Sequence, residues 1–428
     1  MFLYNKSGDK FKTLCYYIIN IYFRGAIMDN YNLILDYAKN NYKKMFREPD
    51  GILKHKFIVP GAAYSNSLWD WDSWLTNIAL RDFVEEDISE YEKGCILNFL
   101  DHMEDDGKMP IFILPAKAWY NSDNNPETNI HKPCFAQHAE FIVKSHDNDV
   151  EWIRPHFDKF LKFVDYYYNN QRHESGLYFW INDCAIGVDN DPSTYYRPQN
   201  SSASIYLNCL MYKELEAVCS LGELLGVDVT KYKAEAENLK KSVQDLCFDE
   251  KDGMYYSADL NLLPVDPNKV LHSGAPRHWN TLIQRIGCWS GFMAMWAGIA
   301  TPEQAERMVK ENLLDEKAYW APFGVRTLSK YEKMYSIKKT GNPSCWLGPI
   351  WGISNYMVFD GLVKYGFVKE AKELAEKTLK LFGEDIAKNG ELHEYYDPES
   401  GEWVNNPGFQ NWNLFAIKMG QWLKENKD

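Results

Sequence analysis

A short turn motif recurs along this chain, and its spacing limits the folds that the sequence can adopt. The motif is an acidic or polar residue, then glycine, then an apolar or extended step, as in PDGIL, DDGKMPIF, ESGLYFW, KDGMYYS and NGELHEYY. Its glycines are residues 51, 107, 176, 253 and 390, separated by 56, 69, 77 and 137 positions. The last gap is about twice the mean of the others, and Gly324 of APFGVRT lies inside it. Six turns therefore divide the chain into units of about 71 residues.

Helical periodicity fills the intervals between these turns. Apolar residues recur at i, i+3 and i+4 over residues 30–45, 89–103, 134–145, 152–168, 203–225, 232–246, 287–299, 302–314, 352–366 and 369–382. Thr301 and Gln304 around Pro302 have the spacing of a helix capping box. Strand-like alternation is sparse and short, so the sequence predicts a mainly α protein.

Each interval holds about two helices, which predicts six helical hairpins. Hairpins that each bury one face must stack on their neighbours, as an open solenoid or a closed toroid. The units differ greatly in sequence and the loops carry Trp, Asp and Glu, so we expect a closed (α/α)6 toroid with its site at the loop-bearing end. No linker interrupts residues 28–428, which we expect to form one domain. Residues 1–27 are expected to be a frayed arm or a wrongly assigned start, because Met28 opens a better helix.

The net charge limits the expected partners, and the cysteines indicate the compartment. The formal charge of −13 repels phosphate backbones and anionic lipid, so nucleic acid and membrane partners are not expected. Nine cysteines without a C-x-x-C pair suit reduced thiols and a cytoplasmic location. Aromatic residues make up 15% of the chain, and their rings can fill a core or provide flat faces for sugars.

Several common sequence motifs for nucleotide binding and for hydrolysis are missing from the sequence. It contains no H-E-x-x-H, no P-loop, no G-x-G-x-x-G and no G-x-S-x-G. What remains is carboxylates among aromatic rings, in LWDWDSW (68–74), AIGVDNDPSTYYRP (185–198) and ELHEYYDPESGEW (391–403). Glycoside hydrolysis needs an acid held protonated by an apolar setting and a second carboxylate that activates water. Turn-forming residues or calcium ligands are the alternative for Asp189 and Asp191.

The first of these segments places two aspartates close together in the sequence but not in space. If residues 71–82 form a helix, Asp72 lies in its first turn and Asp70 lies on a different face. They cannot then act as one acid and base pair. One of them can instead cap the helix while the tryptophans fill a barrel wall.

Four blocks of the sequence resemble a known group of enzymes. VPGAAYSNSLWDWDSW, AIGVDNDP, CWLGPIWGISNYMVFDGLVKYG and HEYYDPESGEWVNNPGFQNWNLF occur in the order found in the (α/α)6 glycosidases of glycoside hydrolase family 63 and their trehalase relatives. The chain looks most similar to the short bacterial mannosylglycerate and glucosylglycerate hydrolases. The resemblance implies an inverting α-glycosidase acting on a small α-glucoside or α-mannoside. We expect no cofactor and no catalytic metal.

The resemblance also implies roles for particular residues. Asp189 matches the general acid and Glu394 the general base, with the two carboxyl groups roughly 6.5–9.5 Å apart so that a water fits between. Asp72 and Trp71 match a sugar-binding segment. Candidate ring walls are Tyr64, Trp69, Trp346, Trp351 and Trp412. Gln137 and Arg197 are candidates for further substrate contacts, Arg197 for a carboxylate such as glycerate, although a structural ion pair suits it equally.

The sequence departs from the relatives at two places, and it leaves two other functions as alternatives. Trehalases carry an arginine where this chain has Ala63 or Tyr64, which argues against trehalose, and CWLGPIW lacks an arginine found in the commoner form. Epimerases of the same architecture use paired histidines, whereas His131, His138, His272 and His278 form no paired motif. A non-catalytic sugar-binding toroid is the third possibility. The acidic loop 183–191 would tolerate calcium, and a homo-oligomer, the sugar and its leaving group stay undetermined.

Overall fold

The computed structural model describes residues 25–120, 128–270, 274, 277–338 and 344–426. Helices dominate its regular structure and the strands are two to five residues long, which confirms the mainly α prediction. Most of the arm expected over residues 1–27 lies outside the described residues. Residues 25–41 are helical and Ile27 is buried, so the boundary expected at Met28 falls inside a helix.

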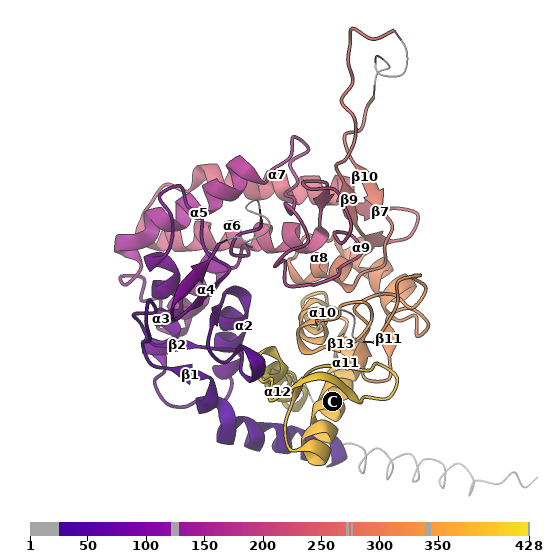
Figure 1. Ribbon diagram of the computed structural model, residues 1–428. Helices are drawn as coiled ribbons and strands as arrows, with labels where there is room; N and C mark the ends of the chain where they lie inside the picture. Colours follow the sequence, from indigo (N-terminus) through magenta and orange to yellow (C-terminus); the bar gives the residue numbers. More distant parts are fainter. Residues whose placement is uncertain (1–24, 121–127, 271–273, 275–276, 339–343, 427–428) are drawn as a thin grey trace, which may run out of the picture.

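In the described part of the chain, six helical segments contact one another in a ring, and Figure 1 shows them around a common centre. They are α2 (Asp70–Leu80), α4 (Phe135–Ser145), α6 (Ile205–Leu225), η5 with α8 (Trp289–Phe292 and Met293–Trp296), α10 (Gly352–Lys364) and η7 with α12 (Asn411–Leu414 and Phe415–Glu425). Each contacts the next, and α12 contacts α2. The cycle of contacts is therefore closed, whereas an open solenoid would separate its first and last units.

A second set of helices lies outside this inner set, as α7 lies outside α6 in Figure 1. It comprises the helix over 25–41 with η1 (Tyr42–Met45), α3 (Ser89–Asp101), η3 with α5 (Arg154–His156 and Phe157–Asn170), α7 (Thr230–Cys247), α9 with the π-helix η6 (Pro302–Arg307 and Met308–Leu313), and α11 (Val368–Asn389). In α5 the buried side chains Phe157, Phe160, Phe163 and Val164 follow helical spacing along one face. Most residues of α6 are buried, as expected for a helix covered on several sides.

The links that run from an outer helix to the next inner helix contain all the named strands, which pair antiparallel. Three two-stranded sheets are β1–β2 (Phe46–Arg47 and Phe57–Ile58), β7–β8 (Phe248–Asp249 and Met254–Tyr255) and β11–β12 (Trp320–Ala321 and Gly324–Val325). Three three-stranded sheets are β3–β4–β5 (Leu68–Trp69, Phe112–Leu114 and Lys117–Trp119), β10–β9–β6 (Leu282–Gln284, Ser257–Asp259 and Ser202–Ala203) and β13–β14–β15 (Ile350–Trp351, His393–Tyr396 and Trp403–Pro407). The short helix η2 (Ala62–Tyr64) lies in the first link.

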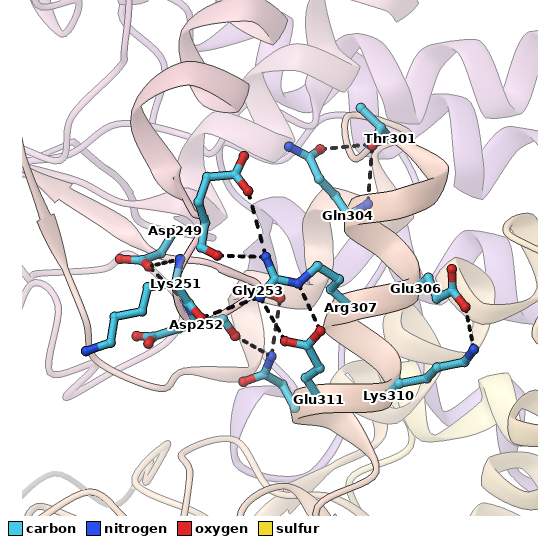
Figure 2. Close-up of polar contacts among 12 residues, drawn as sticks. Asp249, Lys251, Asp252, Gly253, Thr301, Gln304, Glu306, Arg307, Lys310 and Glu311 are labelled. Atoms are coloured by element: carbon cyan, nitrogen blue, oxygen red, sulfur yellow. Dashed lines mark hydrogen bonds and ion pairs between the residues drawn. The ribbon is translucent and has the colours of Figure 1, made fainter.

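The six glycines of the repeated motif lie one in each of these links. All six have a positive φ, a backbone region that favours glycine. At Gly253, shown in Figure 2, the amide donates to Asp249 O at 2.8 Å, and an added Cβ would lie 2.8 Å from Glu311 Oε2. Arg307 bonds both Glu311 and the Glu250 carbonyl, which fastens the turn to α9 and η6.

The capping box expected at Thr301 is present and also appears in Figure 2. The Gln304 amide donates to Thr301 Oγ1 at 3.2 Å, and the Thr301 amide donates to the Gln304 side chain at 2.9 Å. The opposite links, from inner to outer helices, are only three to eight residues long, as at 365–367 and 226–229. No helix in the described ranges is both long and apolar enough to cross a membrane.

Candidate active site

A cavity of about 260 Å³ opens where the outer-to-inner links meet the amino ends of α2, α10 and η7. Its lining residues are Tyr64, Trp69, Trp71, Asp72, Phe112, Trp119, Lys132, Ala185, Gly187, Asp189, Ser344, Trp351, Glu394 and Trp412. Eight of them are residues that the sequence singled out. The three blocks that carry Asp72, Asp189 and Glu394, far apart in sequence, thus contribute to one pocket.

Glu394 lies on β14, whose pleat turns its carboxyl group into the cavity. The Tyr64 hydroxyl donates to Oε1 and the Asn406 side-chain amide donates to Oε2, each at 3.1 Å. Burial raises the pKa of Glu394 to about 7, the charge of Asp189 adds to the rise, and these hydrogen bonds oppose it. Glu394 is therefore oriented by two donors and titrates near neutral pH.

A buried polar network fixes the strand behind Glu394. His393 Nδ1 lies 2.9 Å from Asp385 Oδ2 on α11, and the Tyr396 hydroxyl donates to the same oxygen at 2.7 Å. The His393 backbone amide donates to that hydroxyl at 2.8 Å. Because each group is satisfied in the interior, the network holds β14 against α11.

Asp189 is half-buried and stands in a loop with several positive φ angles, at Ala185, Gly187 and Asn190. Asn190 Oδ1 accepts a hydrogen bond from the Trp346 amide at 3.0 Å, which fastens the loop to the segment before α10. Asp191 accepts from the Ser193 amide at 2.8 Å and so shapes the turn. The turn-forming interpretation thus fits Asp191, whereas Asp189 lines the cavity.

Asp72 is buried at the start of α2 and is held from the far end of the chain. The Asn411 side-chain amide donates to Asp72 Oδ1, and the Thr76 hydroxyl donates to Asn411 Oδ1 at 2.8 Å. Burial and the neighbouring Asp70 raise the pKa of Asp72 to about 8, and Lys132 opposes the rise. Asn411 adopts a φ of 27°, an uncommon conformation for a residue other than glycine. Its side chain links Asp72 and Thr76 of α2.

Asp70 points away from the cavity, in agreement with the helix geometry expected for LWDWDSW. Its two oxygens lie 2.9 and 3.0 Å from Lys132 Nζ, and it also accepts from the Lys132 and Trp71 amides. Lys132 is 2% exposed and its ammonium lies 5.3 Å from the Trp71 ring centroid. The pair is a buried, hydrogen-bonded ion pair beneath the pocket wall.

Aromatic rings form most of the wall. Trp71 and Trp412 meet edge to face with centroids 5.1 Å apart, and Trp351 lies 6.2 Å from Trp412. Trp346, expected in the wall, does not line the cavity but stacks against Trp351 at 4.1 Å. It supports the wall from behind.

Two further predicted contacts are not at the cavity, and the structure corrects both. The Gln137 amide donates to the carbonyls of Pro133 and Leu210, at 2.7 and 3.1 Å, because this face of α4 packs on α6. Arg197 pairs with Asp259 at 2.6 Å, the structural ion pair considered as its alternative. Neither residue is therefore placed to contact a ligand in this pocket.

Sequence reasoning missed Phe112, Trp119, Lys132 and Ser344. The first two follow the Gly107 turn in a strand pair, so the turn itself was the available signal. Lys132 carried no signal, because its burial depends on Asp70, 62 positions away.

Histidines and metal ligands do not contribute to the cavity among the described residues. His131 and His138 are buried and do not line the cavity, and burial lowers the pKa of His131 to about 4 and that of His138 to about 3. His272 lies outside the described residues. His278 is described but does not line the cavity. Over the described ranges, no group of three or more His, Cys, Asp or Glu residues could hold a metal ion.

Comparisons with known proteins identify the family of this chain. A family model described as the mannosylglycerate hydrolase MGH1-like glycoside hydrolase domain matches residues 64–412. Mannosylglycerate hydrolase MGH1 of Selaginella moellendorffii is 21% identical over 421 residues, covering 81% of this chain and 78% of that protein. The cytosolic neutral trehalase of Kluyveromyces lactis is 24% identical, covering 81% of this chain and 51% of that protein.

A solved structure shows the same fold. It is the GH63 mannosylglycerate hydrolase from Thermus thermophilus in complex with Tris and D-glycerate, with a TM-score of 0.68 and 18% identity. The match covers 91% of this chain and 100% of that one.

Proposed function

Because the chain belongs to the mannosylglycerate hydrolase MGH1-like glycoside hydrolase family, we propose that it hydrolyses a small α-glucoside or α-mannoside with inversion at the anomeric carbon. The family membership makes it a glycoside hydrolase. The inverting mechanism and the substrate range, from glucosylglycerate or mannosylglycerate to short α-linked oligosaccharides, are the parts that we propose. We likewise propose that the helix over 25–41 and the chain that follows it form one (α/α)6 toroid, supported by the closed cycle of helix contacts.

In this mechanism Asp189 is the general acid and Glu394 the general base. Glu394 deprotonates a water beneath the anomeric carbon, the water oxygen bonds to that carbon, and Asp189 protonates the leaving oxygen as the glycosidic bond breaks. Asp72 accepts hydrogen bonds from sugar hydroxyls against the rings of Trp71, Trp351 and Trp412. The observation that carries the proposal is that Asp189 and Glu394 line one aromatic cavity, with Glu394 held by two donors.

The Glu394 pKa of about 7 suits a base near neutral pH, since proton transfer is most efficient when the pKa of the catalyst is close to the working pH. Two other functions have weaker support. An epimerase would need histidines at the cavity, and no described histidine lines it. A sugar-binding toroid without turnover would have no need of both carboxyl groups.

We also propose a cytoplasmic location. The eight cysteines of the described ranges are unpaired, and most are buried, as in a reducing compartment. The cytosolic trehalase among the relatives supports the same location.

The test uses two kinds of substrate on three proteins: the wild type, Asp189→Asn and Glu394→Gln. We expect both variants to lose about 10²–10⁴-fold in kcat on a natural glycoside. On a glycosyl fluoride, whose leaving group needs no protonation, Asp189→Asn should recover most of its rate and Glu394→Gln should not. Proton NMR of the wild-type reaction should show the β-anomer first. Release of the α-anomer first, or full activity of Asp189→Asn, would contradict the proposal.

A further inference from the structure

Three aromatic rings form a ladder along one side of the cavity. Trp69, Phe112 and Trp119 are cross-strand partners on β3, β4 and β5. The Trp69 and Phe112 ring centroids lie 4.3 Å apart with planes at 24°, and those of Phe112 and Trp119 lie 5.2 Å apart with planes at 17°. Stacked aromatic rings prefer an offset arrangement over a full face-to-face overlap.

The ladder differs from the rest of the wall in its exposure. Trp71, Trp351 and Trp412 are at most 3% exposed, whereas the three ladder rings are only half-buried although they line the same cavity. The Trp69 indole N–H already donates to Ser67 Oγ at 2.8 Å. The ladder is therefore a partly exposed apolar surface in the same cavity as the carboxyl groups.

The charges at the cavity do not suit an acidic ligand. Three carboxyl groups line it, those of Asp72, Asp189 and Glu394. Lys132 supplies the single positive charge among the described lining residues, and its ammonium is already bonded to both oxygens of Asp70. Arg197, the sequence candidate for a carboxylate, is paired with Asp259 away from the lining. With Glu394 ionised as the general base, a carboxylate on the ligand would meet a like charge and, among the described lining residues, no cation free to bind it.

We propose that the ladder of Trp69, Phe112 and Trp119 binds the leaving group, and that this group is an uncharged sugar ring rather than glycerate or another carboxylic acid. An uncharged ring can lay its C–H face on the indole and phenyl surfaces and keep its hydroxyls toward water. The inference rests on the proposed glycosidase function and narrows its substrate class. The substrate expected for this chain therefore differs from mannosylglycerate, the substrate in the name of its Selaginella relative.

The first experiment compares leaving groups on one donor sugar. The wild type is given α-glucosides and α-mannosides of a hexose, of glycerol and of glycerate, and kcat/KM is measured for each. Glycerol and glycerate differ in one position, CH₂OH or carboxylate, so their comparison isolates the charge. We expect the glycerol compound to exceed the glycerate compound by about tenfold or more, and the hexose compound to exceed both. Preference for the glycerate compound would overturn the inference while leaving the glycosidase proposal intact.

The second experiment removes one aromatic ring, that of Trp119, from the ladder. Trp119→Ala should lower kcat/KM for the disaccharide about tenfold and change the glycerol compound by less than about twofold, whereas Trp119→Tyr should retain most activity. Trp279→Ala is the matched control, since Trp279 is 56% exposed and does not line the cavity. An equal loss on both substrates would contradict a leaving-group subsite.

Calorimetric binding of the disaccharide separates failure of the two proposals. If no glycoside is cleaved but the disaccharide binds, and binds more weakly to Trp119→Ala, the hydrolysis proposal fails and the ladder subsite stands. If the disaccharide neither binds nor is cleaved, both fail.

Discussion

The two kinds of link between the helices differ in length, in strand content and in chemistry. Links from inner to outer helices are three to eight residues long and carry no named strand, and none of their residues lines the cavity. Links from outer to inner helices contain all the named strands and supply most of the cavity lining. The closed helical cycle therefore fixes where the links begin and end, while the outer-to-inner links supply most of the side chains of the candidate site.

The test of this comparison with the largest expected effect removes a polar contact at the cavity. Asn411→Ala should lower kcat/KM about ten- to hundredfold, because Asp72 loses the amide that orients its carboxyl group. Steady-state kinetics and thermal unfolding would measure both effects. Asn200→Ala is the matched control: Asn200 also has a positive φ, at 59°, but is exposed and distant from the lining. Comparable losses of activity in both variants would contradict a positioning role for Asn411.

A second test asks whether the active site reduces stability. The pKa of Glu394 is raised on folding from 4.5 to about 7, so the unfolded chain gives up this proton first and stability falls as pH rises between those values. Glu394→Gln should therefore increase the free energy of unfolding by about 3 kcal/mol at pH 8 and give no gain at pH 4. Denaturant unfolding at both pH values measures this, and equal effects at both would refute it.

A third test concerns the hydrogen bond from Tyr64. Its hydroxyl favours the charged form of Glu394, so Tyr64→Phe should raise the pKa of Glu394 further. The rise of kcat/KM with pH, which reflects ionisation of the base, should move upward by about one pH unit. A pH profile of kcat/KM provides the measurement. An unmoved profile would mean that Glu394 is not the group whose ionisation limits activity.

The smallest effect is expected at the short links. Gly226 ends α6 with a φ of 72°, and an added Cβ would meet no atom within 4 Å. Gly226→Ala should cost about 1 kcal/mol through the backbone alone and leave kcat unchanged. Leu224→Ala, at an exposed site two residues earlier, is the control and should cost less. A marked fall in kcat for Gly226→Ala would break the separation between the two kinds of link.

The parts of the fold that were predictable are those set by local sequence. The six glycine turns need a backbone conformation that few other residues adopt, and the Thr301 capping box uses groups three residues apart, so both could be read directly. Helix α12 was missed because its segment FAIKMGQWLKE is short and follows the aromatic run NWNL without a clear start signal.

The site was predictable where residue type alone implies a role, and not where a role depends on a distant partner. Asp189 and Glu394 stand in recognisable segments and do meet at one cavity. Gln137 and Arg197 are polar residues whose partners, Leu210 and Asp259, are set by the packing of other elements. Lys132 would be taken for a surface residue until Asp70 is seen beside it.

The closed cycle of helices has a consequence for how the protein is made. Tyr64 bonds Glu394 and Asp72 bonds Asn411, so each contact joins residues more than 300 positions apart in sequence. Such contacts form late, because the loop they close is long. A nascent chain synthesised only as far as residue 393 has Asp72 and Asp189 but neither Glu394 nor Asn411. Activity should thus appear only after β14 and η7 are synthesised and docked, and would report closure of the helical cycle.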